Sequence, residues 1–354
     1  MSKRNPRSRL RCCVWLSMLF AGALVLRPTV RGQQVTLHAR SNLVLVPTLV
    51  ESKSGEPVFN LNAQDFVVKD NGIEQKIRLD PNRDQVPMSI VVLVQVGGSA
   101  VREFHKMIGL PTMLSALAGD TRHRIAVVEF DSQPRMLLDF SNNADAVQRA
   151  VYSIRPGDTG AAILDSVWYA VDMLADEPEQ NQRVIVLLSE TRDHGSRTPI
   201  QAVIRKIGRS NVVVYSLAFS PSRADLFDFS HAGGEADLLA PLRMAIAGIK
   251  KNTAAAIPHM TGGQYLRFNH GKQLDSEMGM LANQVHNRYT LSFQPSNPKP
   301  GLHVLSVELK QPLDVRVLAR TSYWAAGLED PEQEPAQQTG ATPGSTQVPG
   351  QPKN

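Results

Sequence analysis

From Met88 onward, short apolar runs alternate with segments of helical periodicity, and this alternation constrains the fold more than any other feature. The apolar runs are 88–96, 124–130, 135–140, 183–189, 212–219 and 263–268. Segment 161–174 places its apolar residues on one helical face, and 101–119 is also helical in pattern, with a kink or break expected at Pro111. Strands that alternate with helices predict an α/β fold: a mostly parallel, Rossmann-like sheet with helices on both faces.

One pair of runs departs from this scheme. Only Asp131–Pro134 separate 124–130 from 135–140, which is too short for a crossover helix. The two runs therefore form a hairpin, and the sheet is expected to carry one antiparallel edge strand.

The segments on either side of this α/β region have a β pattern. We expect an N-terminal β-module at 35–84, the α/β domain at 86–270, and a linking helix with C-terminal strands at 271–325. Neither β set is large enough to satisfy its own edges. The two sets are therefore expected to pack together as one small flanking β-domain, a β-sandwich that the α/β domain interrupts in sequence.

The first 32 residues have the pattern of a signal peptide. A basic start precedes the fifteen-residue apolar run Cys12–Leu26, and cleavage is expected near Gly32. The run is shorter than the roughly 20 residues of a membrane span, so no stable span is expected after cleavage. The prediction is a secreted or periplasmic protein, with a membrane anchor as the alternative.

Removal of this segment changes the charge and cysteine content. Residues 1–32 hold seven of the 38 basic residues, none of the 33 acidic ones, and both cysteines. The remainder has 31 basic and 33 acidic residues, so its charge gives no evidence for a nucleic-acid partner. At the other end, 327–354 is rich in Pro, Gln, Gly and Thr, a composition that predicts a disordered tail.

Several stretches together resemble the von Willebrand factor A (VWFA)-related domain proteins of the secreted acidobacterial type. They include LVLVPTLVESKSGEPVFNLNAQDFVVKDNGIEQKI, RIAVVEFDSQPRMLLDFS, VIVLLSETRDHGS and NRYTLSFQPSNPKPGLHVLSVELK. The resemblance covers about residues 40–325 and implies a von Willebrand A domain with a metal-ion-dependent adhesion site. In that site oxygen ligands hold a divalent cation, and the partner's carboxylate fills an open position.

The resemblance also implies that this site is degenerate. The Asp-x-Ser-x-Ser motif falls on Gln95, Gly97 and Ser99, the Thr of the next motif on Ala161, and the last Asp on Glu190. Thr159, Asp131 and Asp158 are the residues that could replace lost ligands. Because one Glu and one Ser are a poor donor set for Mg²⁺, we expect no cofactor, with residual Mg²⁺ binding as the alternative.

The expected function is non-enzymatic binding or scaffolding of a protein partner whose identity the sequence does not give. The expected partner-binding residues are those of the degenerate adhesion-site loops: Gln95, Gly97, Gly98, Ser99, Thr159, Ala161, Glu190 and Asp193. Gly97 and Gly98 are expected to admit a partner's backbone. One alternative is a metal-dependent adhesin with a rearranged site. Another is a hydrolase that uses Ser99, Glu190 and His194, although no nucleotide-binding, metalloprotease or nucleophile-elbow motif occurs.

Overall fold

The computed structural model describes residues 43–80, 86–106, 109–219, 239–295, 299–311 and 313–326. The expected signal peptide and C-terminal tail lie outside these residues, as does the segment 220–238. In the described part of the chain, no helix combines the length and apolar character needed to cross a membrane.

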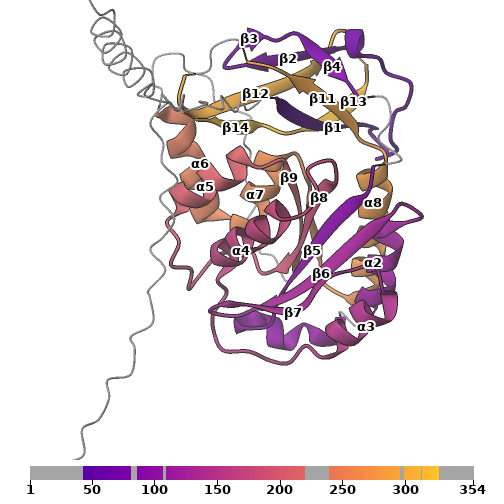
Figure 1. Ribbon diagram of the computed structural model, residues 1–354, viewed down its shortest axis with the longest axis vertical. Coiled ribbons are helices and arrows are strands. Elements are labelled where there is room, and N and C mark those ends of the chain that lie inside the picture. Colours follow the sequence, from indigo (N-terminus) through magenta and orange to yellow (C-terminus); the bar gives the residue numbers. More distant parts are fainter. Residues whose placement is uncertain are drawn as a thin grey trace, which may run out of the picture. The chain divides into compact units, whose positions relative to one another are not determined.

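A six-stranded sheet forms the centre of the α/β domain (Figure 1). Its spatial order is β10 (Tyr265–Phe268), β9 (Val212–Phe219), β8 (Gln182–Ser189), β5 (Met88–Gln95), β6 (His123–Phe130) and β7 (Pro134–Ser141). Neighbouring strands are parallel except for the β6–β7 pair, which is antiparallel. The predicted fold class is therefore confirmed, and the predicted hairpin forms one edge of the sheet.

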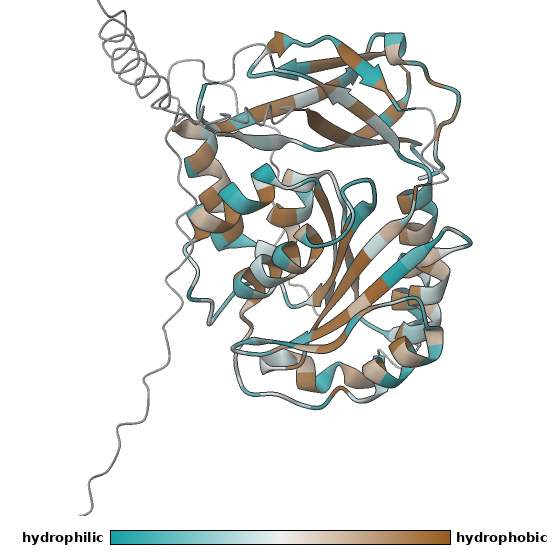
Figure 2. Cartoon of the chain, viewed as in Figure 1, coloured by the Kyte–Doolittle hydropathy of each residue, from teal (hydrophilic) through white to brown (hydrophobic). Residues whose placement is uncertain are grey.

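Helices cover both faces of this sheet, and the alternation of side chains along β5 explains how. Ile90 and Val92 belong to one core, and Val91 and Leu93 belong to the other. Three helices complete the first core: α2 (Leu110–Ala118), α3 (Ala144–Tyr152) and α8 (Gly271–His286). Four helices complete the second core: α4 (Ile163–Ala175), α5 (Ile200–Arg209), α6 (Ala240–Lys251) and α7 (Thr253–Thr261). All eight residues of β5 are buried, and Figure 2 shows the central strands as predominantly hydrophobic.

The structure corrects the expected helix at 101–119. Two short 3-10 turns, Gly98–Arg102 and Phe104–Lys106, come first, and α2 begins only at Leu110. Pro111 lies in the first turn of α2, where its missing N–H costs no helical hydrogen bond. The proline therefore starts a helix and does not kink one.

The remaining strands form two four-stranded sheets, and each sheet contains strands from both flanking segments (Figure 1). One has the order β13 (Val315–Ala319), β1 (Val44–Ser52), β11 (Tyr289–Phe293), β4 (Ile77–Leu79); the other has β14 (Ser322–Ala325), β12 (Gly301–Leu309), β2 (Phe66–Asp70), β3 (Ile73–Glu74). Val46 and Leu291 from one sheet share a core with Val68 and Leu305 from the other. The two sheets therefore form a small β-sandwich.

The β-sandwich packs directly on the α/β domain. Trp324 of β14 lies against Gly208 in the last turn of α5, where an added Cβ would come within 2.8 Å of the Trp324 Cβ. The buried Arg320 guanidinium donates to the carbonyl of Gly208 (2.7 Å) and to that of Ser322 (2.7 Å). Helix α5 is thereby joined to the sandwich through both packing and hydrogen bonds.

Candidate functional site

Loops at the C-terminal ends of β5, β6 and β8 meet in front of α4. The backbone N–H of Gly98 donates to Asp158 O (2.9 Å), and that of Ala162 donates to Asp131 O (2.8 Å). Ala161 and His194 form a two-way backbone bridge, with N···O distances of 2.8 and 3.0 Å. This end of an open parallel sheet is where α/β proteins place their ligands, so it is the candidate site.

Gln95 lies at the centre of the site, fully buried at the end of β5. Its Nε2 donates to Gly97 O (3.0 Å), and its Oε1 accepts from the backbone N–H of Glu190 (2.9 Å). The amide therefore uses both its donor and its acceptor to connect the end of β5 to the end of β8.

The two glycines that follow allow the chain to approach itself. Gly97 is buried, and a Cβ there would come within 2.8 Å of Asp158 O and overlap the carbonyl oxygen of Gly160. Gly98 has a φ of +56°, a left-handed conformation that favours glycine. At Gly97, then, the missing side chain makes room for the protein's own backbone.

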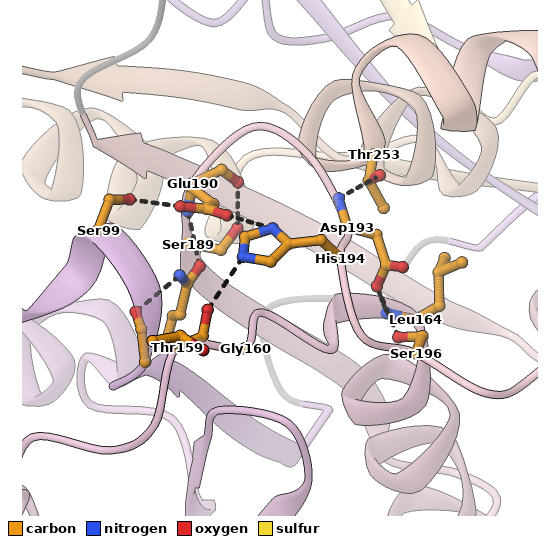
Figure 3. A network of polar contacts seen from close by, with 12 residues as sticks. Ser99, Thr159, Gly160, Leu164, Ser189, Glu190, Asp193, His194, Ser196 and Thr253 are labelled. Atoms are coloured by element: carbon orange, nitrogen blue, oxygen red, sulfur yellow. Dashed lines mark hydrogen bonds and ion pairs between the residues drawn. The ribbon is translucent and has the colours of Figure 1, made fainter.

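A chain of polar contacts crosses the site (Figure 3). The Ser99 hydroxyl donates to Glu190 Oε2, and Glu190 Oε1 lies 2.7 Å from His194 Nδ1. The other ring nitrogen, Nε2, donates to the carbonyl of Thr159 (3.2 Å). The Glu190 side chain is only 18% exposed, whereas that of His194 is 52% exposed. The loop after β5, the loop after β8 and the segment that precedes α4 are thus connected through one carboxylate and one imidazole.

Asp193 points the other way, toward the first turn of α4 (Figure 3). Its Oδ1 accepts from the N–H of Leu164 (2.9 Å) and from the hydroxyl of Ser196 (2.6 Å). Burial raises the pKa of Asp193, an effect that these hydrogen bonds only partly offset. Because Ala162, the N-cap residue of α4, has no side-chain hydrogen bond to offer, Asp193 supplies the cap from a neighbouring loop.

Asp131 and Asp158, the two expected replacement ligands, are engaged elsewhere. Both carboxylate oxygens of Asp131 accept from Arg135 Nη1 (3.1 and 2.9 Å). Asp158 Oδ1 accepts from the N–H groups of Gly160 (2.7 Å) and Ser132 (3.1 Å). The hydrogen bond from Gly160 is the main reason that the pKa of Asp158 lies below its usual value. The Asp131 carboxylate thus bonds to β7, and the Asp158 carboxylate links the segment before α4 to the loop after β6.

The donor set does not fit the divalent cation that the sequence resemblance implies. Ser99 and Glu190 have side-chain oxygens that could bind a cation, but the Ser99 hydroxyl bonds to Glu190 and the second Glu190 oxygen faces His194. Ala161 has no side-chain oxygen, and the Gln95 oxygen is held by Glu190 N–H. Within the described ranges, no three His, Cys, Asp or Glu side chains are grouped so that they could hold a metal ion. A hard cation needs about six oxygen ligands, which these side chains do not offer.

The structure divides the predicted partner-binding residues by exposure. Gln95, Gly97 and Ala161 are buried; Gly98, Ser99, Glu190 and Asp193 are partly exposed; Thr159 is exposed. His194 was not among these residues, although its ring contacts two of them. The available signal was its spacing: a histidine four residues after Glu190, directly beyond a buried strand.

The family model described as von Willebrand factor type A domain matches residues 90–251. This part of the chain is a von Willebrand A domain. The match begins within β5 and ends with α6, so it includes all the loops of the site except the residues of α7 that contact them. No curated protein matches the chain.

Solved structures with similarity to the chain come from several organisms. An aerotolerance-related membrane protein from Bacteroides fragilis NCTC 9343 is 15% identical, with 55% of this chain and 98% of that chain covered and a TM-score of 0.40. The von Willebrand domain of the type V pili tip protein Mfa5 from Porphyromonas gingivalis is 12% identical (57% and 95% covered, TM-score 0.37). Proximal thread matrix protein 1 from the mussel byssus, with a zinc-occupied adhesion motif, is 14% identical (63% and 50% covered, TM-score 0.38). At these identities and TM-scores, no residue role carries over to this von Willebrand A domain.

Proposed function

We propose that this chain is a non-enzymatic protein-binding or scaffolding protein whose von Willebrand A domain docks a protein partner without a metal ion. The observation that carries the proposal is the chain of contacts from Ser99 through Glu190 and His194 to Thr159. It joins the loops at the ligand-binding end of the sheet with the protein's own groups. The exposed Thr159 and the half-exposed His194 ring then form part of the surface offered to a partner.

The same contacts argue against a hydrolase. In a Ser-His-Asp triad the imidazole contacts the nucleophile and takes its proton. Here the Glu190 carboxylate lies between the serine and the histidine, and His194 Nε2 donates to a backbone carbonyl. Ser99 therefore has no adjacent base of the kind that activates a serine nucleophile.

We further propose that the protein is exported to the periplasm or the extracellular space, on the strength of the basic and apolar pattern of residues 1–32. N-terminal sequencing of the protein recovered from its own cells tests this. A start near Gln33 is expected, and an intact Met1 in the cytoplasmic fraction would contradict it.

A pull-down from the organism's own cell envelope, with and without EDTA, tests the binding function. The bait variant is Thr159→Lys, which adds bulk and charge at the exposed rim; the matched control is Gln180→Lys, an exposed residue that precedes β8 at the opposite end of the sheet. We expect a partner that survives EDTA, is lost with Thr159→Lys and is retained with Gln180→Lys. Release by EDTA would favour the metal-dependent adhesin, and equal retention by both variants would place binding elsewhere.

A further inference from the structure

Helices α5 and α6 are basic and contain no acidic residue. Their sequences, IQAVIRKIGR and APLRMAIAGIKK, each have three Arg or Lys residues and no Asp or Glu. Apolar residues of both helices pack in the same core as Leu302 of β12 and Trp324 of β14, so the two helices lie beside the end of the β-sandwich (Figure 1). Positive charge is therefore concentrated on this part of the protein.

Arg205 lies where α5 meets β14. Its guanidinium carbon is 5.2 Å from the centre of the Trp324 ring. Among the residues that the structure describes, no carboxylate pairs with Arg205. In the same part of the chain, Arg205 Nε and Trp324 Nε1 are buried N–H donors without a hydrogen-bond acceptor. The contact between α5 and β14 thus holds a positive charge without a matching negative one.

The chain continues from this place into an acidic segment. Strand β14 ends at Ala325, one residue after Trp324, and the described part of the chain ends at Ala326. The next ten residues, GLEDPEQEPA, contain no Lys or Arg and four acidic residues: Glu329, Asp330, Glu332 and Glu334. An extended chain spans about 3.3–3.6 Å per residue, so the first of these carboxylates comes up to about 10 Å from Ala326 and the last up to about 26 Å. All four are within reach of the Arg205 guanidinium.

We propose that the acidic segment 329–334 docks on α5 beside Trp324, with the Arg205 guanidinium as its main contact. The Trp324 ring covers one face of the guanidinium, and a guanidinium pairs with carboxylates through the N–H groups at its edge, so it binds the ring and a carboxylate at once. A single exposed ion pair contributes little, so the docking depends on several charges and weakens as salt screens them. The docked segment also keeps other acidic chains from this surface.

This surface is separate from the candidate site. Helix α5 begins after the β8 loop, which belongs to the site, and its last turn contacts Trp324 at Gly208. The inference therefore goes beyond the proposed binding function and does not depend on it. Its test uses the full chain alone and needs no partner.

Fluorescence quenching reports contact between the tail and Trp324. A nitroxide attached to Gln333→Cys, between the acidic residues, quenches tryptophan emission when it touches the ring. Trp324 is the only tryptophan, and residue 333 the only cysteine, once four other residues are replaced: Trp15→Phe, Trp168→Phe, Cys12→Ser and Cys13→Ser. The emission of each labelled chain is divided by that of the same chain without the label.

The matched control is a chain in which the four acidic residues are replaced by Gln or Asn. It has the same length, so it measures the quenching that chance contacts cause. At low salt we expect the emission ratio of the acidic chain to be roughly half that of the neutral chain, because weak ion pairs on a short tether give a partly docked population. At about 1 M NaCl, where the Debye length is about 3 Å, the two ratios should be equal.

A second pair of variants tests the role of Arg205. Arg205→Gln should raise the ratio of the acidic chain to that of the neutral chain. Arg149→Gln should leave it unchanged, since Arg149 is an exposed arginine of α3, which packs on the other face of the sheet.

Equal ratios for the acidic and neutral chains at low salt would overturn the proposal. A difference that falls on dilution would also overturn it, because the tail would then dock on a second copy of the chain. The comparison of the two tails leaves every residue of α5 and β14 unchanged, so it decides the matter even if Arg205→Gln fails to fold.

Discussion

The side-chain amide of Gln95 accepts a hydrogen bond from the backbone N–H of Glu190 over 2.9 Å and donates one to Gly97 O over 3.0 Å. An aspartate, which the sequence resemblance implies at this position, is one methylene shorter and has no donor. It would also bring a second negative charge into a fully buried position close to Glu190. Without a divalent ion to offset that charge, a neutral amide is the residue type that fits.

The first prediction follows from this pairing. Gln95→Asp should destabilise the fold by about 1–3 kcal/mol or more, because it leaves the Glu190 N–H and the Gly97 carbonyl without their partner. Gln95→Glu is the matched control of equal length, and it should also lose stability because a carboxylate cannot donate to Gly97 O. Urea unfolding measures both, with and without Mg²⁺. If Mg²⁺ raised the stability of Gln95→Asp above that of the unmodified protein, the site would be one mutation from a metal site, and our account of it would be wrong.

A second prediction concerns the cap that Asp193 provides for α4. Asp193→Ala removes the acceptor for Leu164 N–H and should cost about 1 kcal/mol, as for other helix caps. Asp193→Asn keeps an acceptor and removes the charge. Burial raises the pKa of the Asp193 carboxyl group in the folded protein. The contribution of this group to stability is therefore fully present below its unfolded pKa of 3.8, and it is lost as the pH rises through its folded pKa. At pH 7 the Asn variant should therefore be at least as stable as the unmodified protein, as measured by chemical denaturation. A loss as large as that of the Ala variant would contradict the capping role.

The sequence predicted the α/β domain well because its signals are local. A buried central strand such as β5 is a continuous apolar run, and the three residues between β6 and β7 permit only a hairpin. Strand β14 has little signal of its own in the sequence, because Ser322–Ala325 is four residues long and has no clear alternation. The helical pattern around Pro111 was read too far toward the N-terminus, since 3-10 turns and α-helix have similar periods.

The candidate site was harder to predict, because it depends on tertiary contacts between its residues, and a sequence motif does not specify these contacts. The positions of Gln95, Ser99 and Glu190 followed from the resemblance, but their bonds to one another did not. Similarly, the role of Gly97 depends on where the Gly160 carbonyl lies, and that is a tertiary contact. The role of His194 is only partly signalled in the sequence, because Glu190 lies four residues before it but its second partner, the Thr159 carbonyl, lies in a different loop.

The third prediction concerns the core of the β-sandwich. His303 is buried, with Nδ1 2.7 Å from Asp70 Oδ1 and Nε2 2.7 Å from the carbonyl of Lys299; Tyr323 donates to the other Asp70 oxygen (2.7 Å). Burial by itself lowers the pKa of His303, but the hydrogen bonds to Asp70 and Lys299 and the attraction of Asp70 outweigh it, so the pKa lies above 6.5. The pair's contribution to stability is then fully present below pH 6.5 and is lost as pH rises through the raised pKa.

The measurement is the free energy of unfolding between pH 6 and pH 9. The unmodified protein should lose stability over the upper part of this range, and His303→Gln should flatten that part of the curve. Asp70→Asn is the matched control, because it removes the charge that raises the pKa and should flatten the same region. The pH dependence would have to come from other groups if His303→Gln kept the curve of the unmodified protein.

The fourth prediction concerns the junction between the β-sandwich and the von Willebrand A domain. Arg320 is buried, and this burial lowers its pKa to about 10. Its guanidinium donates hydrogen bonds to the carbonyls of Ser322, Gly208 and Leu45, the last at 3.3 Å. Gly208 lies in the last turn of α5, where the helix dipole favours a positive charge. One side chain therefore satisfies carbonyls from the sandwich and from a helix of the α/β domain.

Arg320→Met keeps most of the volume and removes every donor. It should destabilise the chain by about 1–3 kcal/mol for each buried carbonyl left without a partner. Arg320→Lys keeps the charge but not the planar fork, so it should recover only part of the loss. Amide hydrogen exchange in both variants should accelerate in the last turn of α5 and in β1 of the sandwich. It should stay unchanged in β6, which is an interior strand of the six-stranded sheet. Exchange that accelerates equally in all three elements would show that Arg320 supports the whole fold and has no special part in joining the two domains.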